Sequence, residues 1–115
     1  MANNIAFQVM GNTYRLNLTT SSAEVAVNAF TPCNQVRVHN GTATEVAIRF
    51  SPTTGAAAVF PVSGTPSAST ILHSNQTAVF TVPQASISAQ STLYVSGIVG
   101  SGTGYVYITP GEGLS

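Results

Sequence analysis

Two runs of alternating apolar and polar residues, separated by a short polar segment, constrain the fold of this chain most. They lie within Gln35–Ser51, whose sequence is QVRVHNGTATEVAIRFS. Successive side chains of an extended strand point to opposite faces, so a period of two indicates strands with one buried face. The predicted buried face contains the large apolar residues of both runs: Val36, Val38, Val46, Ile48 and Phe50.

Antiparallel pairing across the 40–44 loop would join these two runs in a hairpin. It would place His39 near Glu45 and Val38 near Val46. The outer face of this hairpin would carry ionisable residues that are scarce elsewhere in the chain: Arg37, His39, Glu45 and Arg49. This clustering makes the outer face a candidate polar contact surface, and the alternative is a solvated face without a partner.

Further short strands are expected on both sides of this central segment. Alternating or β-prone runs occupy 5–10, 14–19, 23–28, 71–72, 77–82, 93–99 and 105–108. Seven to nine short strands, with turn signals roughly every 8–12 residues, indicate a sandwich or barrel. We predict an all-β fold, a single antiparallel β-sandwich that is jelly-roll-like or immunoglobulin-like. The length of 115 residues indicates one domain, 1–115.

Two segments are expected to stand apart from the sandwich. The first is an N-terminal arm, 1–12. The second is a long loop, 52–69, which holds three of the six prolines and exceeds the usual connection length. Its apolar centre includes Val59 and Phe60, which would either form an interface or wrap over the protein's own core.

The C-terminal part combines apolar and glycine-rich stretches. Leu93–Val99 is more continuously apolar, as expected for a strand covered on both faces, and Gly97 within it indicates a bulge or a close backbone approach. The glycine-rich 100–104 is predicted to be a hairpin loop. Tyr105 and Tyr107 would share one face of the following strand, either as packed aromatic residues or as a small platform for a sugar.

The composition excludes several classes of partner. Only 5% of the residues are charged, with three arginines and no lysine, whereas a nucleic-acid-binding protein needs several cations to neutralise phosphates. No secretory signal and no apolar run of about 20 residues is present, so neither secretion nor a membrane span is expected.

The net charge of zero provides little repulsion between copies and favours permanent assembly, the alternative being a soluble monomer.

The few ionisable residues form no pattern typical of an enzyme or a metal site. The three glutamates lie on separate predicted elements, which disfavours a catalytic carboxylate pair. A Ser-His-Glu triad could use Glu45 with His39 or His73, but no nucleophile-elbow sequence is present. Cys33 is the only cysteine, and its spacing from the two histidines matches no zinc motif. We therefore expect no enzymatic activity, cofactor or bound metal.

Three stretches carry a resemblance to a known family. They are VRVHNGTATEVAIRF (Val36–Phe50), SNQTAVFTV (Ser74–Val82) and YVSGIVGSGTGYVYITPGEG (Tyr94–Gly113). The chain resembles the small all-β proteins that are encoded in the head-gene region of tailed bacteriophages, which are similar to capsid decoration, or cement, proteins. The likeness covers roughly Gln35 to the C-terminus.

The resemblance implies a non-enzymatic component of the virion. Such a protein is made in the host cytoplasm and binds the major capsid protein at capsomer junctions on the capsid exterior, where it stabilises the shell. A homo-oligomer is expected, with a trimer favoured over a dimer because trimers fit threefold positions. The alternative is a tail or fibre adhesion module that binds a host surface glycan. The six candidate interface residues are Arg37, His39, Glu45, Arg49, Val59 and Phe60.

Overall fold

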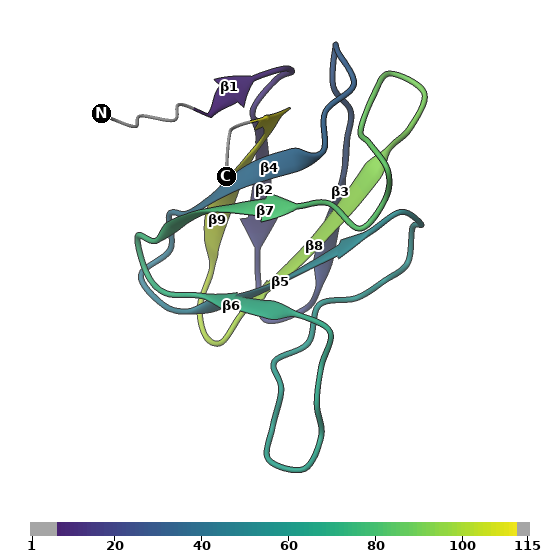
Figure 1. Ribbon diagram of the computed structural model, residues 1–115. Helices are drawn as coiled ribbons and strands as arrows, with labels where there is room; N and C mark the ends of the chain where they lie inside the picture. The colour runs from purple at the N-terminus through teal and green to yellow at the C-terminus, as the bar shows by residue number, and fades with distance from the viewer. Residues whose placement is uncertain (1–6, 113–115) are drawn as a thin grey trace, which may run out of the picture.

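The computed structural model describes residues 7–112, and these form nine β-strands and no helix. The strands are β1 (Gln8–Val9), β2 (Tyr14–Leu18), β3 (Ala23–Val27), β4 (Gln35–Asn40), β5 (Val46–Ser51), β6 (Thr70–Leu72), β7 (Thr77–Thr81), β8 (Leu93–Val99) and β9 (Gly104–Glu112). They make two antiparallel sheets that pack face to face (Figure 1). The predicted all-β sandwich is confirmed.

The two sheets divide the strands almost equally. The first sheet has the order β1-β9-β4-β7, and β2 also pairs with β9, next to β1 along the same edge. The second sheet has the order β3-β8-β5-β6. Among the described residues from β2 to β9, only the connection between β5 and β6 joins two neighbouring strands of the same sheet. Every other connection in this part of the chain crosses from one sheet to the other.

The strand pairs are nested within one another. β5 pairs with β6, β4 with β7, β3 with β8, and β2 with β9. The chain is therefore one long antiparallel hairpin whose turn is the 52–69 loop. This hairpin is wound up so that β4 meets β9 and β5 meets β8. Such winding of eight strands into two sheets is the jelly-roll arrangement, which decides between the two predicted kinds of sandwich.

The hairpin predicted within Gln35–Ser51 is wrong. β4 belongs to the first sheet and β5 to the second, so the 41–45 connection is an arch across the core. His39 lies opposite Thr77 and Tyr107, not opposite Glu45. The alternating pattern requires only that both strands turn one face to the interior, and two strands that face each other across the core meet this requirement as well as a paired hairpin does.

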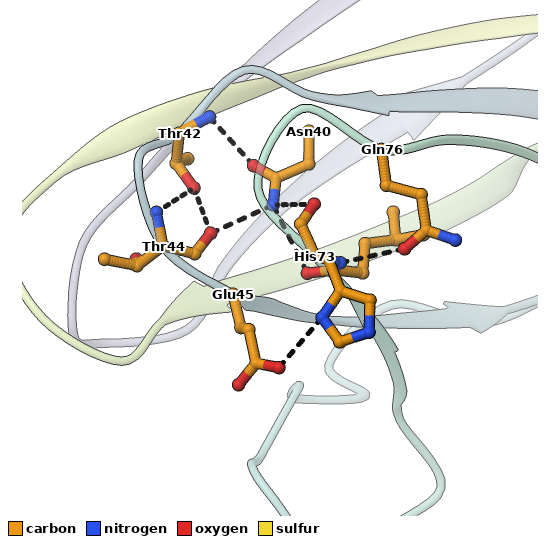
Figure 2. A network of polar contacts seen from close by, with 7 residues as sticks. Asn40, Thr42, Thr44, Glu45, His73 and Gln76 are labelled. Atoms are coloured by element: carbon orange, nitrogen blue, oxygen red, sulfur yellow. Dashed lines mark hydrogen bonds and ion pairs between the residues drawn. The ribbon is translucent and has the colours of Figure 1, made fainter.

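The buried side chain of Asn40 holds this arch in place (Figure 2). Its Nδ2 donates to the carbonyl oxygens of Thr44 at 3.0 Å, Leu72 at 3.3 Å and His73 at 2.9 Å. Its Oδ1 accepts a hydrogen bond of 2.8 Å from the backbone N–H of Thr42. Asn40 thus joins the β4–β5 arch to the β6–β7 connection and satisfies polar groups that leave the ladders where the chain changes sheets.

Two further sequence predictions about the strands need correction. The 100–104 segment is a second arch and not a hairpin loop, since β8 and β9 lie in different sheets. The predicted strand at 5–10 is reduced to β1 among its described residues, and it pairs with Gly111 and Glu112 of the same chain. Residues 1–6 of the predicted arm lie outside the described residues.

The apolar face predicted from the alternation forms the centre of the core. Val36, Val38, Val46 and Ile48 are all 0% exposed. Phe50 is only half-buried and packs against Phe80, with ring centroids 5.2 Å apart.

Gly97 is the site of the close approach that was predicted for β8. A Cβ atom at Gly97 would lie 2.7 Å from Leu18 Cδ2 and 3.2 Å from Ile48 Cδ1. The inner face of β8 is buried throughout, but on its outer face only Ser96 is buried while Tyr94 and Ile98 are half-buried, so the predicted cover of both faces is confirmed only in part.

Candidate functional site

The six predicted interface residues lie in three different places. Arg37 and His39 are on β4, on the outer face of the first sheet. Glu45 is the last residue of the arch, and its Oε2 lies 3.0 Å from His73 Nδ1. The remaining three, Arg49, Val59 and Phe60, line one groove at the 52–69 loop. The prediction of a single polar surface on a β4–β5 hairpin is therefore wrong. Because β4 and β5 lie in different sheets, their charged faces are on opposite sides of the molecule.

The first half of the 52–69 loop lies over the outer face of the second sheet. The carboxylate of Glu24, on β3, accepts hydrogen bonds from the Thr54 hydroxyl at 2.6 Å and the Gly55 N–H at 3.0 Å. Ser96, on β8, donates to the Ala56 carbonyl at 2.5 Å. Ala58 is 1% exposed. This part, which we call the loop base (54–58), wraps over the protein's own sheet.

The next residues project away from the sandwich, as the teal loop in Figure 1 shows. Val59 is 54% exposed and Val62 is 64% exposed. The returning limb supports this loop tip (59–67), because Ser67 donates to the Val59 carbonyl at 2.6 Å and Ser69 Oγ accepts from the Val59 N–H at 3.1 Å. The wrap-over alternative is confirmed for the loop base, whereas the loop tip presents apolar surface and its role as an interface stays a prediction.

A groove of about 370 Å³ runs between the loop tip and β5. Arg49 lies at one side of it and donates to the Ala57 carbonyl at 3.4 Å. Val59, Phe60 and Val62 supply much of its apolar lining. The Phe60 ring is half-buried and comes within 3.9 Å of the position that a Cβ atom of Gly100 would occupy. The groove can therefore accept an apolar side chain or a short segment of a partner next to one guanidinium group.

A second site lies on the outer face of the first sheet. One side chain from each of four neighbouring strands forms a row across the sheet, in the order Arg15, Tyr107, His39, Thr77. A hollow of about 430 Å³ covers part of this row and extends to Arg37. The alternation in the sequence placed His39 on an outer face, but Arg15 and Thr77 were not recognised as site residues, because the register that makes them neighbours is not visible in the sequence.

The two tyrosines of β9 differ in their surroundings. Tyr105 packs edge-on against Tyr107 with centroids 5.0 Å apart, and the guanidinium carbon of Arg15 lies 4.3 Å above the Tyr105 ring. Tyr105 also fills the space beside Gly41, where a Cβ atom would overlap its ring. Tyr105 is thus a packed aromatic residue, whereas Tyr107 is 36% exposed and lines the hollow.

The structure brings together one pair from the catalytic patterns that were considered. His73 and Glu45 form an exposed pair, with side chains 74% and 57% exposed. Within 7–112, no serine hydroxyl is hydrogen-bonded to the His73 imidazole. In the same range, no group of three or more His, Cys, Asp or Glu side chains could share a metal ion, and no helix could cross a membrane.

Cys33 is enclosed in the core and not part of either site. It is 1% exposed and forms an isolated bridge with Ile87. Burial, and secondarily the negative charge of Glu112, raises the pKa of the Cys33 thiol. An uncharged buried thiol behaves as a small apolar side chain.

Comparisons with protein-family models, with curated proteins and with solved structures give no match to this chain.

Proposed function

We propose that this protein is a non-enzymatic virion component that decorates a phage capsid, binding across capsomer junctions and stabilising the shell. The observation that carries the proposal is the loop tip, which presents Val59 and Val62 to solvent at one end of the sandwich. The likeness of Val36–Phe50, Ser74–Val82 and Tyr94–Gly113 to head-region proteins supplies the kind of partner. Jelly rolls serve viral capsids and lectins alike, so the fold is compatible with this function without requiring it.

The loop tip is suited to docking on a large protein surface. When a partner covers exposed apolar side chains, the complex is stabilised by about 25 cal/mol per Å² of apolar area removed from water. The hydrogen bonds that Val59 accepts from Ser67 and donates to Ser69 hold this part of the loop before binding, which lowers the entropic cost of docking. The partner in this proposal is the major capsid protein, contacted by several copies at once so that weak contacts add up.

Self-association is part of the same proposal. The chain has zero net charge, and within residues 7–112 its sheets end in strands with one unpaired edge, including β7 and β6. Unpaired edges favour contact with another chain. A homo-oligomer, with a trimer favoured over a dimer, would place several loop tips on one face at a threefold position.

A binding experiment with particles that lack this protein tests the capsid function. The double variant Val59→Asp/Phe60→Asp is expected to lose co-sedimentation with the particles while keeping the wild-type circular dichroism spectrum. The control is Phe30→Asp. Phe30 is 74% exposed and lies in the β3–β4 connection, at the end of the sandwich opposite the 52–69 loop (Figure 1).

The control is expected to bind as the wild type does. Loss of binding by Phe30→Asp with normal binding by the double variant would place the interface at the opposite end and contradict the proposal. Unfolding of the double variant would instead mean that the loop tip is part of the core.

A tail or fibre adhesion module is the second candidate, favoured by the exposed ring of Tyr107 beside polar side chains. The copy number in the particle distinguishes the two. A number comparable to that of the major capsid protein is expected for a decoration protein, and a far smaller number would support the tail location.

A further inference from the structure

The hollow on the outer face of the first sheet has a composition unlike that of the loop-tip groove. Its lining combines one guanidinium, one imidazole, one phenol ring and three hydroxyl groups, from Arg37, His39, Tyr107, Thr13, Thr77 and Thr109. It holds about 430 Å³, which is within the usual range for a small-molecule site.

The charges around this hollow are all of one sign. Arg15 and Arg37 point to this face, and within 7–112 neither forms an ion pair with a carboxylate. Arg15 is hydrogen-bonded to Asn17 and lies over the Tyr105 ring. Arg37 lies 5.2 Å from the centroid of Phe7. A face with two guanidinium groups and no described carboxylate attracts anions.

The three glutamates are held away from this face. The Glu24 carboxylate is hydrogen-bonded to the loop base on the second sheet, and Glu45 pairs with His73 at the arch. Glu112 is on β9 at an even-numbered position, on the same face of the strand as the buried Ile108. Together with burial, its negative charge contributes to the raised pKa of the enclosed Cys33 thiol. The topology thus separates the charges of a neutral chain and leaves two guanidinium groups, from Arg15 and Arg37, on the outer face of the first sheet.

The hydroxyl groups of the hollow are already oriented. His39 Nδ1 and the Thr77 hydroxyl are 2.7 Å apart, and the hydroxyls of Thr13 and Thr109 are 2.8 Å apart. Each of these hydroxyl oxygens keeps a lone pair that can accept a further hydrogen bond. His39 keeps Nε2 for a ligand, because within the described chain its imidazole is bonded through Nδ1 only.

The hollow lies over the middle of the first sheet, and this position restricts the kind of ligand that it can bind. Both edges of β4 and of β9 are paired, β4 with β7 and β9 and β9 with β4 and β2. A peptide therefore cannot add to these strands through its backbone, which is the usual way in which a sheet binds an extended peptide. A ligand over β4 and β9 is recognised by side chains alone.

We propose that this hollow binds an acidic saccharide. The apolar face of the sugar ring packs on the exposed Tyr107 ring, and the carboxylate lies against the Arg37 guanidinium. The sugar hydroxyls exchange hydrogen bonds with His39 Nε2 and with the hydroxyls of Thr77 and Thr13. A single-stranded nucleic acid would also stack on aromatic rings, but it needs a longer cationic path than two arginines provide. The proposal does not depend on the capsid function, because the loop tip is a different surface, and it specifies the class of glycan that the second candidate function would need at Tyr107.

Nuclear magnetic resonance titration of the full chain tests this assignment. The probes are glucuronate and glucose, which differ by a carboxylate in place of a hydroxymethyl group, and acetate, which supplies the carboxylate alone. Glucuronate is expected to shift the amide signals of Arg37, His39 and Tyr107 in a saturable way, with a dissociation constant on the order of millimolar. Glucose and acetate are each expected to bind at least about tenfold more weakly.

Two variants and a matched control complete the test. Arg37→Gln is expected to abolish the preference for glucuronate over glucose, and Tyr107→Ala to weaken both sugars. Arg49→Gln removes an arginine from the second sheet and is expected to leave glucuronate binding unchanged. Absence of glucuronate shifts at these residues, equal binding of glucose or acetate in the wild type, or loss of binding in Arg49→Gln would each overturn the proposal. Tighter binding of oligothymidylate than of glucuronate would overturn it in favour of a nucleic acid.

Discussion

The side-chain amide of Asn40 donates a hydrogen bond of 2.9 Å to the main-chain carbonyl of His73, which joins two connections 33 residues apart (Figure 2). Both connections carry the chain from one sheet to the other. Asn40 is 0% exposed, so its amide satisfies these polar groups from inside the fold. The relationship between these two residues therefore has a measurable energetic consequence.

Asn40→Ala is expected to lower the free energy of unfolding by about 2–4 kcal/mol, because the buried hydrogen bonds to the Leu72 carbonyl and from the Thr42 N–H are lost together with the part-buried one to His73. Urea denaturation measures this change. The control is Asn17→Ala, whose exposed amide accepts a hydrogen bond from Arg15 and should change the stability by less than about 0.5 kcal/mol. Equal effects of the two substitutions would show that the arch does not depend on Asn40.

Gly97→Ala is expected to destabilise the protein by about 1–3 kcal/mol, because the new methyl group overlaps Leu18 in a packed core. A double-mutant cycle with Leu18→Ala measures the coupling, and the double variant should lose less stability than the sum of the two single variants. Gly100→Ala is the control, since its nearest neighbour is Phe60 at 3.9 Å. Additive effects of Gly97→Ala and Leu18→Ala would contradict the close approach.

Adjacent residues of the 52–69 loop should respond very differently to a buried charge. Ala58→Asp places a carboxylate at a position that is 1% exposed and should cost at least about 2 kcal/mol of stability. Val59→Asp places the same group at a position that is 54% exposed and should cost less than about 0.5 kcal/mol. Thermal unfolding of both variants locates the boundary between loop base and loop tip. A large loss in Val59→Asp would mean that the tip packs on the sandwich.

The raised pKa of Cys33 predicts a loss of stability at alkaline pH. The native thiol keeps its proton at a pH where the unfolded thiol, with an ordinary pKa of 9.0, has lost it. The unfolded state then binds fewer protons than the native state, so stability falls as the pH rises above 9.0 and is unaffected by this group below it. The slope contributed by one thiol is at most about 1.4 kcal/mol per pH unit.

Denaturation at several pH values measures this effect by comparing the wild type with Cys33→Ala and Cys33→Ser. Both variants lack the thiol and should show a shallower decline above pH 9.0 than the wild type. Identical slopes in all three proteins would show that another group controls the alkaline transition.

Much of the fold was predictable from the sequence, whereas its connectivity was not. Alternation placed the central strands and assigned Val36, Val38, Val46 and Ile48 to the interior, where all four are fully buried. The same alternation suggested that β4 and β5 pair, which is wrong. A polar segment between two strands can form a hairpin turn or an arch, and the side chain of Asn40 stabilises an arch through partners at 72 and 73 that are distant in sequence.

The candidate sites show the same division. Val59 and Phe60 were identified from the apolar centre of a loop, and they line a groove together with Arg49. The grouping of Arg37 and His39 with Arg49 and Glu45 failed because it assumed the β4–β5 hairpin. The row from Arg15 to Thr77 could not be predicted, because it depends on the register of three strand pairs at once.

The sequence by itself determined that this protein is built from short strands with one apolar face, because a period of two leaves no other regular structure that buries those residues together. Only the tertiary structure decided which strands pair, where the long hairpin turns and which charges share a face. The physical reason is that strand pairing uses backbone N–H and C=O groups, which nearly all residues possess. The choice among partners therefore depends on how the whole chain closes two sheets around one core.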